Sequence, residues 1–197
     1  MLGRPRDGAP YGSDPAVALL ELSSVARGYR VADALVKRAT VVIRRAEPIE
    51  PGKYLLIFSG PVGEVEEAYD AGTAEAAGTL LDQLFLPQVE PRVVLALAGA
   101  LPEHEIDAIA VVECYTVASA VLGLDAALKA AEVRPVDLRL AQDLGGKGFF
   151  VLTGELVDIE AAVEAAKGVI RGDALIEIVA RPHADFVDAV LRPRRRG

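Results

Sequence analysis

Cysteine is almost absent from this chain of 197 residues, and histidine is scarce. The single Cys114 cannot form an internal disulfide bond, which is typical of a protein kept in the reducing cytosol. Cys114 and the two histidines, His104 and His183, do not have the spacing of a zinc site. The sequence therefore predicts neither a disulfide framework nor a metal centre, and we expect no cofactor.

Long apolar runs are also missing. The longest one, VVLALAGAL at 93–101, is well short of the roughly 20 residues that a membrane-spanning helix needs. Residues 1–14 lack the apolar region of a signal peptide, so we expect a disordered leader there. The formal net charge of −8 argues against general nucleic-acid binding. Residues 192–197 form a basic exception, interpreted as a solubilising tail or, alternatively, as a contact for a partner or nucleic acid.

Catalytic motifs are equally sparse. No Gly-x-Ser-x-Gly elbow is present, and His104 lies among acidic residues that solvation explains. The stretch GGKG at 145–148 is similar to a phosphate-binding loop, but Ala141 stands in place of the first glycine and Gly148 in place of the magnesium-binding Ser or Thr. The sequence therefore predicts that the protein is not an enzyme. Assembly or ligand binding fits this inventory better.

Apolar residues, by contrast, are abundant. They make up 52% of the chain, and the mean hydropathy is +0.30 although 25% of the residues are charged. This excess indicates either a large core or apolar surface that is buried between subunits, because obligate interfaces resemble a core cut in half.

The sequence contains an internal duplication. DALVKRA at 33–39 returns as DAALKAA at 125–131, an offset of 92 that also relates Glu21 to Glu113. GKYLLIFSG returns as GKGFFVLTG at an offset of 94, which places two extra residues between Val133 and Gly146. This period is too long for a solenoid repeat. We therefore expect two copies of one domain, at 15–97 and 107–191, joined by a linker at 98–106.

The same order of elements is expected in both copies. Each begins with an aliphatic strand, continues with a helix, a glycine-containing hairpin, a second helix and a fourth strand, and closes with a short apolar helix. Ser24 and Thr116 are expected to cap the first helix of each copy. The order β-α-β-β-α-β-α predicts an α+β, ferredoxin-like fold, with an antiparallel-rich sheet flanked by helices.

Periodicity predicts which side chains of these elements face the core. One set recurs at helical spacing in the first helix, namely Val25, Tyr29, Ala32, Leu35, Val36 and Ala39. Alternation in the strand of the second copy assigns inward positions to Val136, Leu138 and Leu140.

Several motifs together resemble the bacterial microcompartment (BMC) shell domain. The second copy has VVECYT at the end of its first strand, then DAALKAA, TGE after the hairpin, and ARPH near the end. The first copy departs from the pattern, since it has no acid after Gly60 and no Arg-Pro-His. Two fused, unpermuted copies resemble the tandem-domain subclass, whose members form trimers with pseudo-sixfold symmetry. The resemblance implies a cytoplasmic shell protein whose discs tile with other shell proteins into facets.

The resemblance also implies residues for assembly between discs. Lys37 and Lys129 match a lysine that, in the family, contacts the neighbouring disc across a symmetry axis. A lysine stem can lie along apolar surface while its ammonium reaches a neighbour's carbonyl oxygens. Arg181 matches a second edge contact that the first copy lacks, so the edges of a trimer would alternate in strength. The alternative interpretation is an ordinary solvent-exposed lysine on a helix.

The hairpin loops correspond to the pore of the family. The residues concerned are Glu50, Pro51, Gly52, Leu144, Gly145 and Gly146. Glycine suits loops that converge on an axis, although tight turns alone also explain these glycines. Three Glu50 carboxylates near one axis would repel one another and favour an open pore for small metabolites, and Lys53 and Lys147 could offset that charge.

Some features of relatives remain open or are not expected. Some tandem relatives stack as two trimers, which this sequence does not decide. Others hold an iron–sulfur cluster through a pore cysteine, and we expect none here because Cys114 lies in a strand. The main alternative function is a small-molecule-binding, trimeric regulatory protein with a ferredoxin-like fold; an enzyme comes third. We expect neither membrane nor nucleic acid as a partner.

Overall fold

A computed structural model describes residues 15–191 of the chain. The leader at 1–14 and the basic tail at 192–197 lie outside the described residues. The chain divides into two compact units between Val94 and Leu95, and each unit is described by itself. Between residues 15 and 191, no helix is long and apolar enough to cross a membrane.

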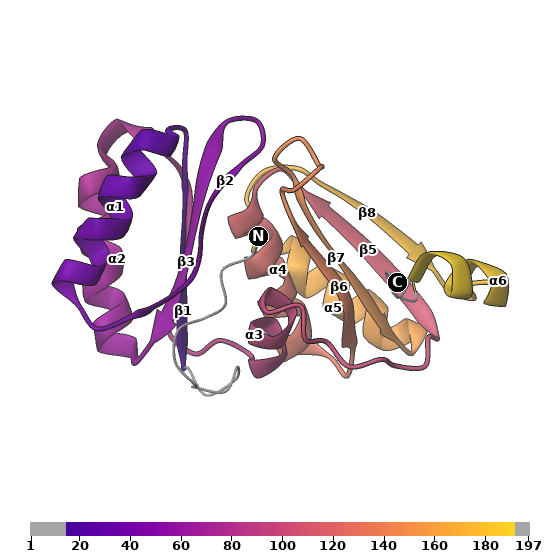
Figure 1. Cartoon of the computed structure of the whole chain (residues 1–197). Helices are drawn as coiled ribbons and strands as arrows, with labels where there is room; N and C mark the ends of the chain where they lie inside the picture. The colour runs from indigo at the N-terminus through magenta and orange to yellow at the C-terminus, as the bar shows by residue number, and fades with distance from the viewer. Residues whose placement is uncertain (1–14, 192–197) are drawn as a thin grey trace. The chain divides into compact units, whose positions relative to one another are not determined.

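The first unit is an antiparallel sheet with two long helices on one face (Figure 1). The strands follow the order β2-β3-β1-β4 across the sheet. In chain order the elements are β1 (Ala16–Leu22), α1 (Val25–Arg38), β2 (Val42–Ile49), β3 (Lys53–Gly60), α2 (Val62–Ala76), the 3₁₀-helix η1 (Ala77–Thr79) and β4 (Leu80–Leu86). The short helix α3 (Pro91–Leu97) follows and contains the boundary between the two units.

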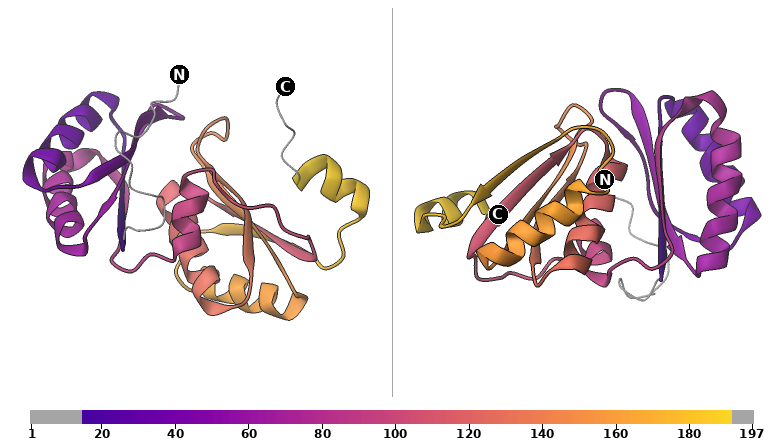
Figure 2. Two further views of the ribbon diagram at one scale, coloured as in Figure 1. Left: turned by 60° about the horizontal axis from the view of Figure 1, so that its bottom comes forward. Right: turned by 180° about the vertical axis from the view of Figure 1, so that it is seen from behind.

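The second unit repeats this architecture, with sheet order β6-β7-β5-β8 and α4 and α5 along one face (Figure 2). Its elements are β5 (Ala108–Cys114), α4 (Val117–Ala130), β6 (Arg134–Leu140), β7 (Gly148–Gly154), α5 (Leu156–Lys167), β8 (Ala174–Val179), α6 (Ala184–Phe186) and the π-helix η2 (Val187–Leu191). Residues 98–107 contain no helix or strand. The predicted α+β fold with two ferredoxin-like units is therefore confirmed.

Side-chain caps fix where the first helix of each unit begins. The hydroxyl of Ser24 accepts a hydrogen bond from the backbone N–H of Arg27, at 3.2 Å. The hydroxyl of Thr116 accepts one from the N–H of Ser119, at 3.1 Å. Each bond satisfies a donor that the helix itself leaves unpaired. Both predicted caps are confirmed.

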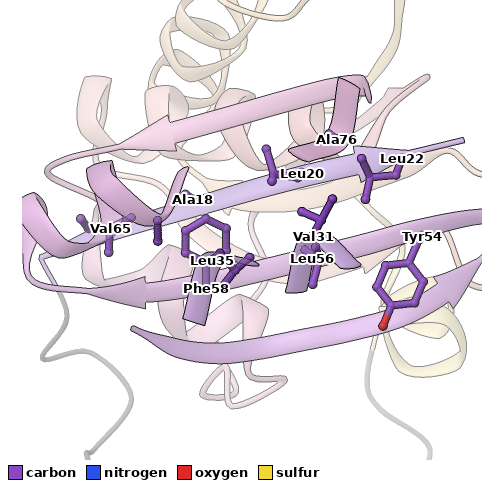
Figure 3. Packing of buried hydrophobic residues seen from close by; sticks show 12 residues of the cluster. Ala18, Leu20, Leu22, Val31, Leu35, Tyr54, Leu56, Phe58, Val65 and Ala76 are labelled. Carbon is purple, nitrogen blue, oxygen red and sulfur yellow. The ribbon is translucent and has the colours of Figure 1, made fainter. Parts of the chain in front are cut away.

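The core of the first unit lies between the helices and one face of the sheet (Figure 3). Alternate residues of β1 and β3 point toward the helices because successive side chains of a strand face opposite sides. The fully or nearly buried residues include Ala18, Leu20, Leu22, Leu56, Phe58, Val31, Leu35, Val65 and Ala76.

The buried face of α1 differs from the predicted one. Its buried residues are Gly28, Val31 and Leu35, whereas Tyr29 is 64% exposed and Val36 is 45% exposed. The predicted inward position is therefore confirmed for Leu35 and for Val25, Ala32 and Ala39, which are partly buried against the core. It is wrong for Tyr29 and Val36. The reason is local packing: Gly28 lets the ring of Tyr54 lie against the helix backbone, and the ring of Tyr29 lies beside it, tilted by 43°, with centroids 5.4 Å apart.

A β-bulge changes the alternation that was predicted for β6. The register shifts between Pro135 and Asp137, so Val136 falls out of the paired pattern. Leu138 pairs with Phe150 and Leu140 with Gly148, on the side that faces the helices. The inward assignment was therefore wrong for Val136, which lines a cavity with residues of the opposite face.

The contact between the first helix and the third strand of each unit is made by different residues in the two units. A Cβ placed on Gly28 would lie 2.2 Å from Cδ1 of Tyr54. The matching positions of the second unit are Ala120 (28 + 92) and Gly148 (54 + 94), and a Cβ on Gly148 would lie 2.8 Å from the Cβ of Ala120. The small residue therefore sits on the helix in one copy and on the strand in the other.

This exchange predicts a compensating pair of substitutions. Gly148→Ala should lower the free energy of unfolding by about 1–3 kcal/mol because it overpacks the contact. Adding Ala120→Gly should remove the overpacking and so restore part of the lost stability. The recovery is incomplete because glycine inside a helix itself costs roughly 0.5–1 kcal/mol. Denaturant unfolding of the two single variants and the double variant measures the coupling, and strict additivity would contradict this account.

Candidate pore loops and assembly edge

The first candidate pore loop is a three-residue turn. Glu50, Pro51 and Gly52 connect β2 to β3, and Glu50 is exposed. The N–H of Gly52 donates a hydrogen bond to the carbonyl oxygen of Ile49, at 3.1 Å. Gly52 has a φ of +90°, a conformation that residues with a Cβ rarely adopt, and open space surrounds it. The glycine is therefore required by the turn itself.

The second candidate pore loop is longer and spans residues 141–147. The N–H of Lys147 donates to the carbonyl oxygen of Leu144, at 3.2 Å, and the N–H of Ala141 donates to the carbonyl oxygen of Lys147, at 2.9 Å. Gly145 and Gly146 have φ values of +60° and +89°. The two loops therefore differ in length, and Glu50 of the first loop has no carboxylate counterpart among Leu144, Gly145 and Gly146.

An ion pair at the base of each hairpin repeats between the two units. Nζ of Lys53 lies 3.6 Å from Oε2 of Glu21, whose side chain is fully buried. Nζ of Lys147 lies 2.6 Å from Oε1 of Glu113. The hydrogen bond to Glu113 and the charge of that carboxylate raise the pKa of Lys147 above its ordinary value. Each pair connects the start of the hairpin's second strand to the end of the first strand of the unit.

These ion pairs give both lysines a partner that the sequence analysis did not name. Whether Lys53 and Lys147 also offset the charge of Glu50 stays a prediction, and each forms an ion pair with a strand glutamate. The duplication already showed that Glu21 and Glu113 occupy matching positions. That they pair with Lys53 and Lys147 could not be predicted, because this depends on β1 lying beside β3 and β5 beside β7.

The candidate edge lysines are each paired with a carboxylate one helical turn earlier. Nζ of Lys37 lies 2.6 Å from Oδ2 of Asp33, and Nζ of Lys129 lies 2.6 Å from Oδ2 of Asp125. Both lysines lie in the last turn of their helix, where the helix dipole favours a positive charge. Both aspartates stand in the repeated motifs DALVKRA and DAALKAA, where a spacing of four residues indicates such a pair.

The third candidate edge residue, Arg181, is exposed in the segment between β8 and α6. Its neighbour His183 caps α6: Nδ1 of His183 accepts a hydrogen bond from the N–H of Asp185, at 3.2 Å. The pore candidates thus lie in two hairpin loops, and the edge candidates lie on α1, on α4 and after β8.

Cys114 is buried in β5 and lies in neither hairpin loop. Its position does not fit a cluster held by a loop cysteine, because residues 50–52 and 141–147 contain no cysteine. Across the described range 15–191, no group of three or more His, Cys, Asp or Glu residues could hold a metal ion.

The buried thiol leads to a prediction about its reactivity. Burial, with a smaller contribution from the charge of Glu113, raises the pKa of Cys114 to about 12. Because the thiolate is the reactive form, its population at pH 8 is about three orders of magnitude below that of a free cysteine. We expect a thiol-specific dye to label Cys114 in guanidinium but not in the native protein. Rapid labelling of the native protein would contradict this.

The fold and these features define a class of protein: a tandem α+β protein that carries a glycine-containing hairpin loop in each unit and an exposed lysine at matching helix positions. The family model described as the BMC domain matches residues 16–89 and again residues 108–183. The chain therefore belongs to the BMC-domain family, the one to which its motifs were similar.

Individual relatives agree with this assignment. The chain is 34% identical over 171 residues to the bacterial microcompartment shell protein PduT of Citrobacter freundii, with 85% of this chain and 93% of that protein covered. A solved structure of a microcompartments protein from Desulfitobacterium hafniense DCB is 33% identical, has a TM-score of 0.77 and covers 88% of this chain and 98% of its own.

A third comparison concerns the fold alone. The fused permuted hexameric shell protein of the RMM microcompartment is 22% identical, with a TM-score of 0.59 over 78% of this chain and 80% of that chain.

Proposed function

We propose that this protein is a structural component of a bacterial microcompartment shell and has no catalytic role. The observation that carries the proposal is the presence of two matched BMC domains in one chain, at residues 16–89 and 108–183, together with the relationship to a named shell protein over most of both lengths. In this role the chain assembles with itself and with other shell proteins in the cytoplasm. The domain limits of 15–97 and 107–191, with a linker at 98–106, belong to the same proposal.

The assembly unit we propose is a homotrimer, in which three chains supply six domains around one axis. Exposed apolar side chains in both units are candidates for burial between chains of such a trimer. In the first unit they include Tyr29 and Val36 of α1. In the second unit Leu175 is 63% exposed on β8 and Val190 is 61% exposed on η2.

Electron microscopy of the purified full-length protein tests this proposal. We expect flat discs of three chains that join into sheets or tubes as the concentration rises. A monodisperse monomer or dimer at every concentration would overturn the shell role. Whether discs also stack in pairs is visible in side views of the same sample.

The central opening of the proposed disc would be formed by the two hairpin loops, that is, by Glu50, Pro51, Gly52, Leu144, Gly145 and Gly146. Small metabolites would pass between these loops. Two features support this use: each loop contains glycine with a positive φ, which leaves backbone without a side chain at that position, and the ion pairs at Lys53 and Lys147 fix the base of each hairpin.

The charge of this opening leads to a prediction. Glu50→Gln should leave the trimer intact and lower the preference of the pore for cations over anions by about fivefold, because a unit charge near 4 Å in water is worth about 1 kcal/mol. The measurement is the cation-to-anion conductance ratio of the isolated discs. Glu66→Gln, which removes the same charge from the exposed surface of α2, is the matched control. Loss of the trimer in the Glu50 variant would mean that the turn is structural.

A small-molecule-binding regulatory role remains the second candidate, because the second unit contains a cavity of about 440 Å³. That volume lies in the range of ligand sites. Apolar residues of the sheet and of the C-terminal helices line most of it, including Val111, Phe149, Val151, Phe186 and Val190. Calorimetry with candidate metabolites on a protein that does not form discs would favour this role.

A further inference from the structure

We propose that Asp33 and Asp125 neutralise and position the edge lysines, so that two discs can meet without repulsion between their cations. This inference rests on the proposed shell function, and in particular on a contact between discs at Lys37 and Lys129. It assigns a role to two residues that the pattern of the family left without one.

The geometry of the two pairs is the same. In both units the carboxylate lies four residues before the lysine on the same helix, and the distance between Nζ and Oδ2 is 2.6 Å. A distance this short between charged groups indicates a strong, charge-assisted hydrogen bond. At a spacing of four the two side chains lie on one side of the helix. The bond therefore holds the lysine stem along the helix surface and fixes the place of the ammonium.

Helix stability does not explain why the pair is present twice. Asp is a poorer helix former than Ala, and exposed pairs contribute little to stability. The side chains of Asp33 and Lys37 are 60% and 72% exposed, so water already solvates both charges. Helix stability therefore gives the exposed pair of the first unit little weight, and a role outside the single helix is open to it.

Charge neutralisation provides such a role. At an edge contact across a symmetry axis, equivalent lysines of two discs come close, and two unpaired ammonium groups would repel each other. The other cations of α1 are also paired with carboxylates, in their case on α2: Arg38 with Glu67, at 3.2 Å, and both Arg27 and Arg30 with Glu75, at 2.9 and 3.0 Å. With Asp33 in place, the ammonium of Lys37 uses one donor for the carboxylate and can offer others to carbonyl oxygens of a neighbour.

The two copies differ in one respect that guides the experiment. The side chain of Asp125 is only 6% exposed, whereas that of Asp33 is 60% exposed. A substitution at Asp125 therefore disturbs buried surroundings, while Asp33→Asn changes a solvated position and leaves the fold intact. Asp33→Asn is thus the variant that separates charge from folding.

The test measures the lowest protein concentration at which the full chain forms sheets, in low and in high salt. In about 10 mM salt, where the Debye length is about 30 Å, we expect Asp33→Asn to raise this concentration about tenfold over the unmodified protein. In about 1 M salt, where the Debye length falls to about 3 Å, the difference should disappear. Asp33→Glu, which keeps the carboxylate, should behave as the unmodified protein does.

A matched control removes a similar pair elsewhere. Glu164 and Lys167 on α5 form an exposed pair, also at 2.6 Å, so Glu164→Gln should leave sheet formation unchanged at both salt concentrations. Sheets of Asp33→Asn at the unmodified concentration in low salt would overturn the proposal, as would an equal loss at both salt concentrations. If the unmodified protein forms no sheets, the shell function itself fails. If Lys37→Ala loses sheets and Asp33→Asn does not, only the role of the aspartate fails.

Discussion

Replacing Lys37 and Lys129 together by alanine is expected to abolish sheets and leave the trimer intact. Both lysines are at least 45% exposed and lie in the last turn of α1 and α4, so neither is needed for the core. Their proposed role is at the disc edge, where each ammonium would donate hydrogen bonds to carbonyl oxygens of a neighbouring disc. Light scattering measures the trimer and electron microscopy measures the sheets.

The control for this prediction accounts for the unequal surroundings of the two lysines. Removing Lys129 takes one charged partner from the buried carboxylate of Asp125, which we expect to lower the free energy of unfolding by about 1–3 kcal/mol. Lys37→Ala, at an exposed pair, should change it little. Lys167→Ala removes an exposed lysine of α5 and should not affect sheets. Sheets that persist in the double variant would remove the edge assignment.

The single variants address the difference between the two edges. Arg181 follows β8 in the second unit, and the first unit has Pro87 at the matching position (181 − 94). We therefore propose that the edge of the second unit has an additional contact. On this account Lys37→Ala and Lys129→Ala weaken different edges.

Val36→Glu is expected to convert the trimer into folded monomers. Tyr29 and Val36 lie seven residues apart on α1 and form an exposed apolar stripe in the single chain, whereas Val25 and Ala32 pack against the core. If this stripe is covered by a second chain, a glutamate there would bury an unpaired charge, which costs several kcal/mol and exceeds what a modest interface provides. Sedimentation measures the oligomer, and circular dichroism shows that the monomer is folded.

A matched substitution on α5 separates the interface from a general effect of charge. Val157 is 66% exposed, more than Val36, and lies in the first turn of its helix, where a negative charge is favourable. Val157→Glu should therefore leave the trimer unchanged. A trimer that survives Val36→Glu would show that this side of α1 faces solvent in the assembly.

Local sequence signals predicted most of each unit. The strands at 16–22 and 108–114 are aliphatic runs, and the caps Ser24 and Thr116 mark the helices that follow, because these features depend on neighbouring residues alone. The duplication then allowed one copy to support the interpretation of the other. Both sheets accordingly have the same strand order.

The errors arose where contacts between distant residues decide the structure. The apolar stripe of α1 was assigned to the core, but Tyr29 and Val36 of that stripe are exposed, and Gly28 is buried under the ring of Tyr54 instead. A bulge in β6 removed Val136 from the alternation, which periodicity cannot anticipate. The ion pair of Lys147 and Glu113 joins residues 34 positions apart, so only the strand pairing reveals it.

The pore and edge residues could not be found from local pattern either, for a different reason. A pore or an edge consists of several chains, so the position of Glu50 or Lys37 in one chain does not distinguish a functional residue from an ordinary surface residue. Their assignment came from the resemblance. The structure added the partners, Asp33 and Asp125 for the lysines and Glu21 and Glu113 for the bases of the hairpins.

The central claim is that three copies of this chain form a disc that tiles through its edges. Electron microscopy of the purified full-length protein, with image averaging, tests it most directly. The account predicts flat, pseudohexagonal discs with six domains around a central opening, joined along edges that contain Lys37 and Lys129. Particles the size of one or two chains at every concentration, with no sheets, would contradict it.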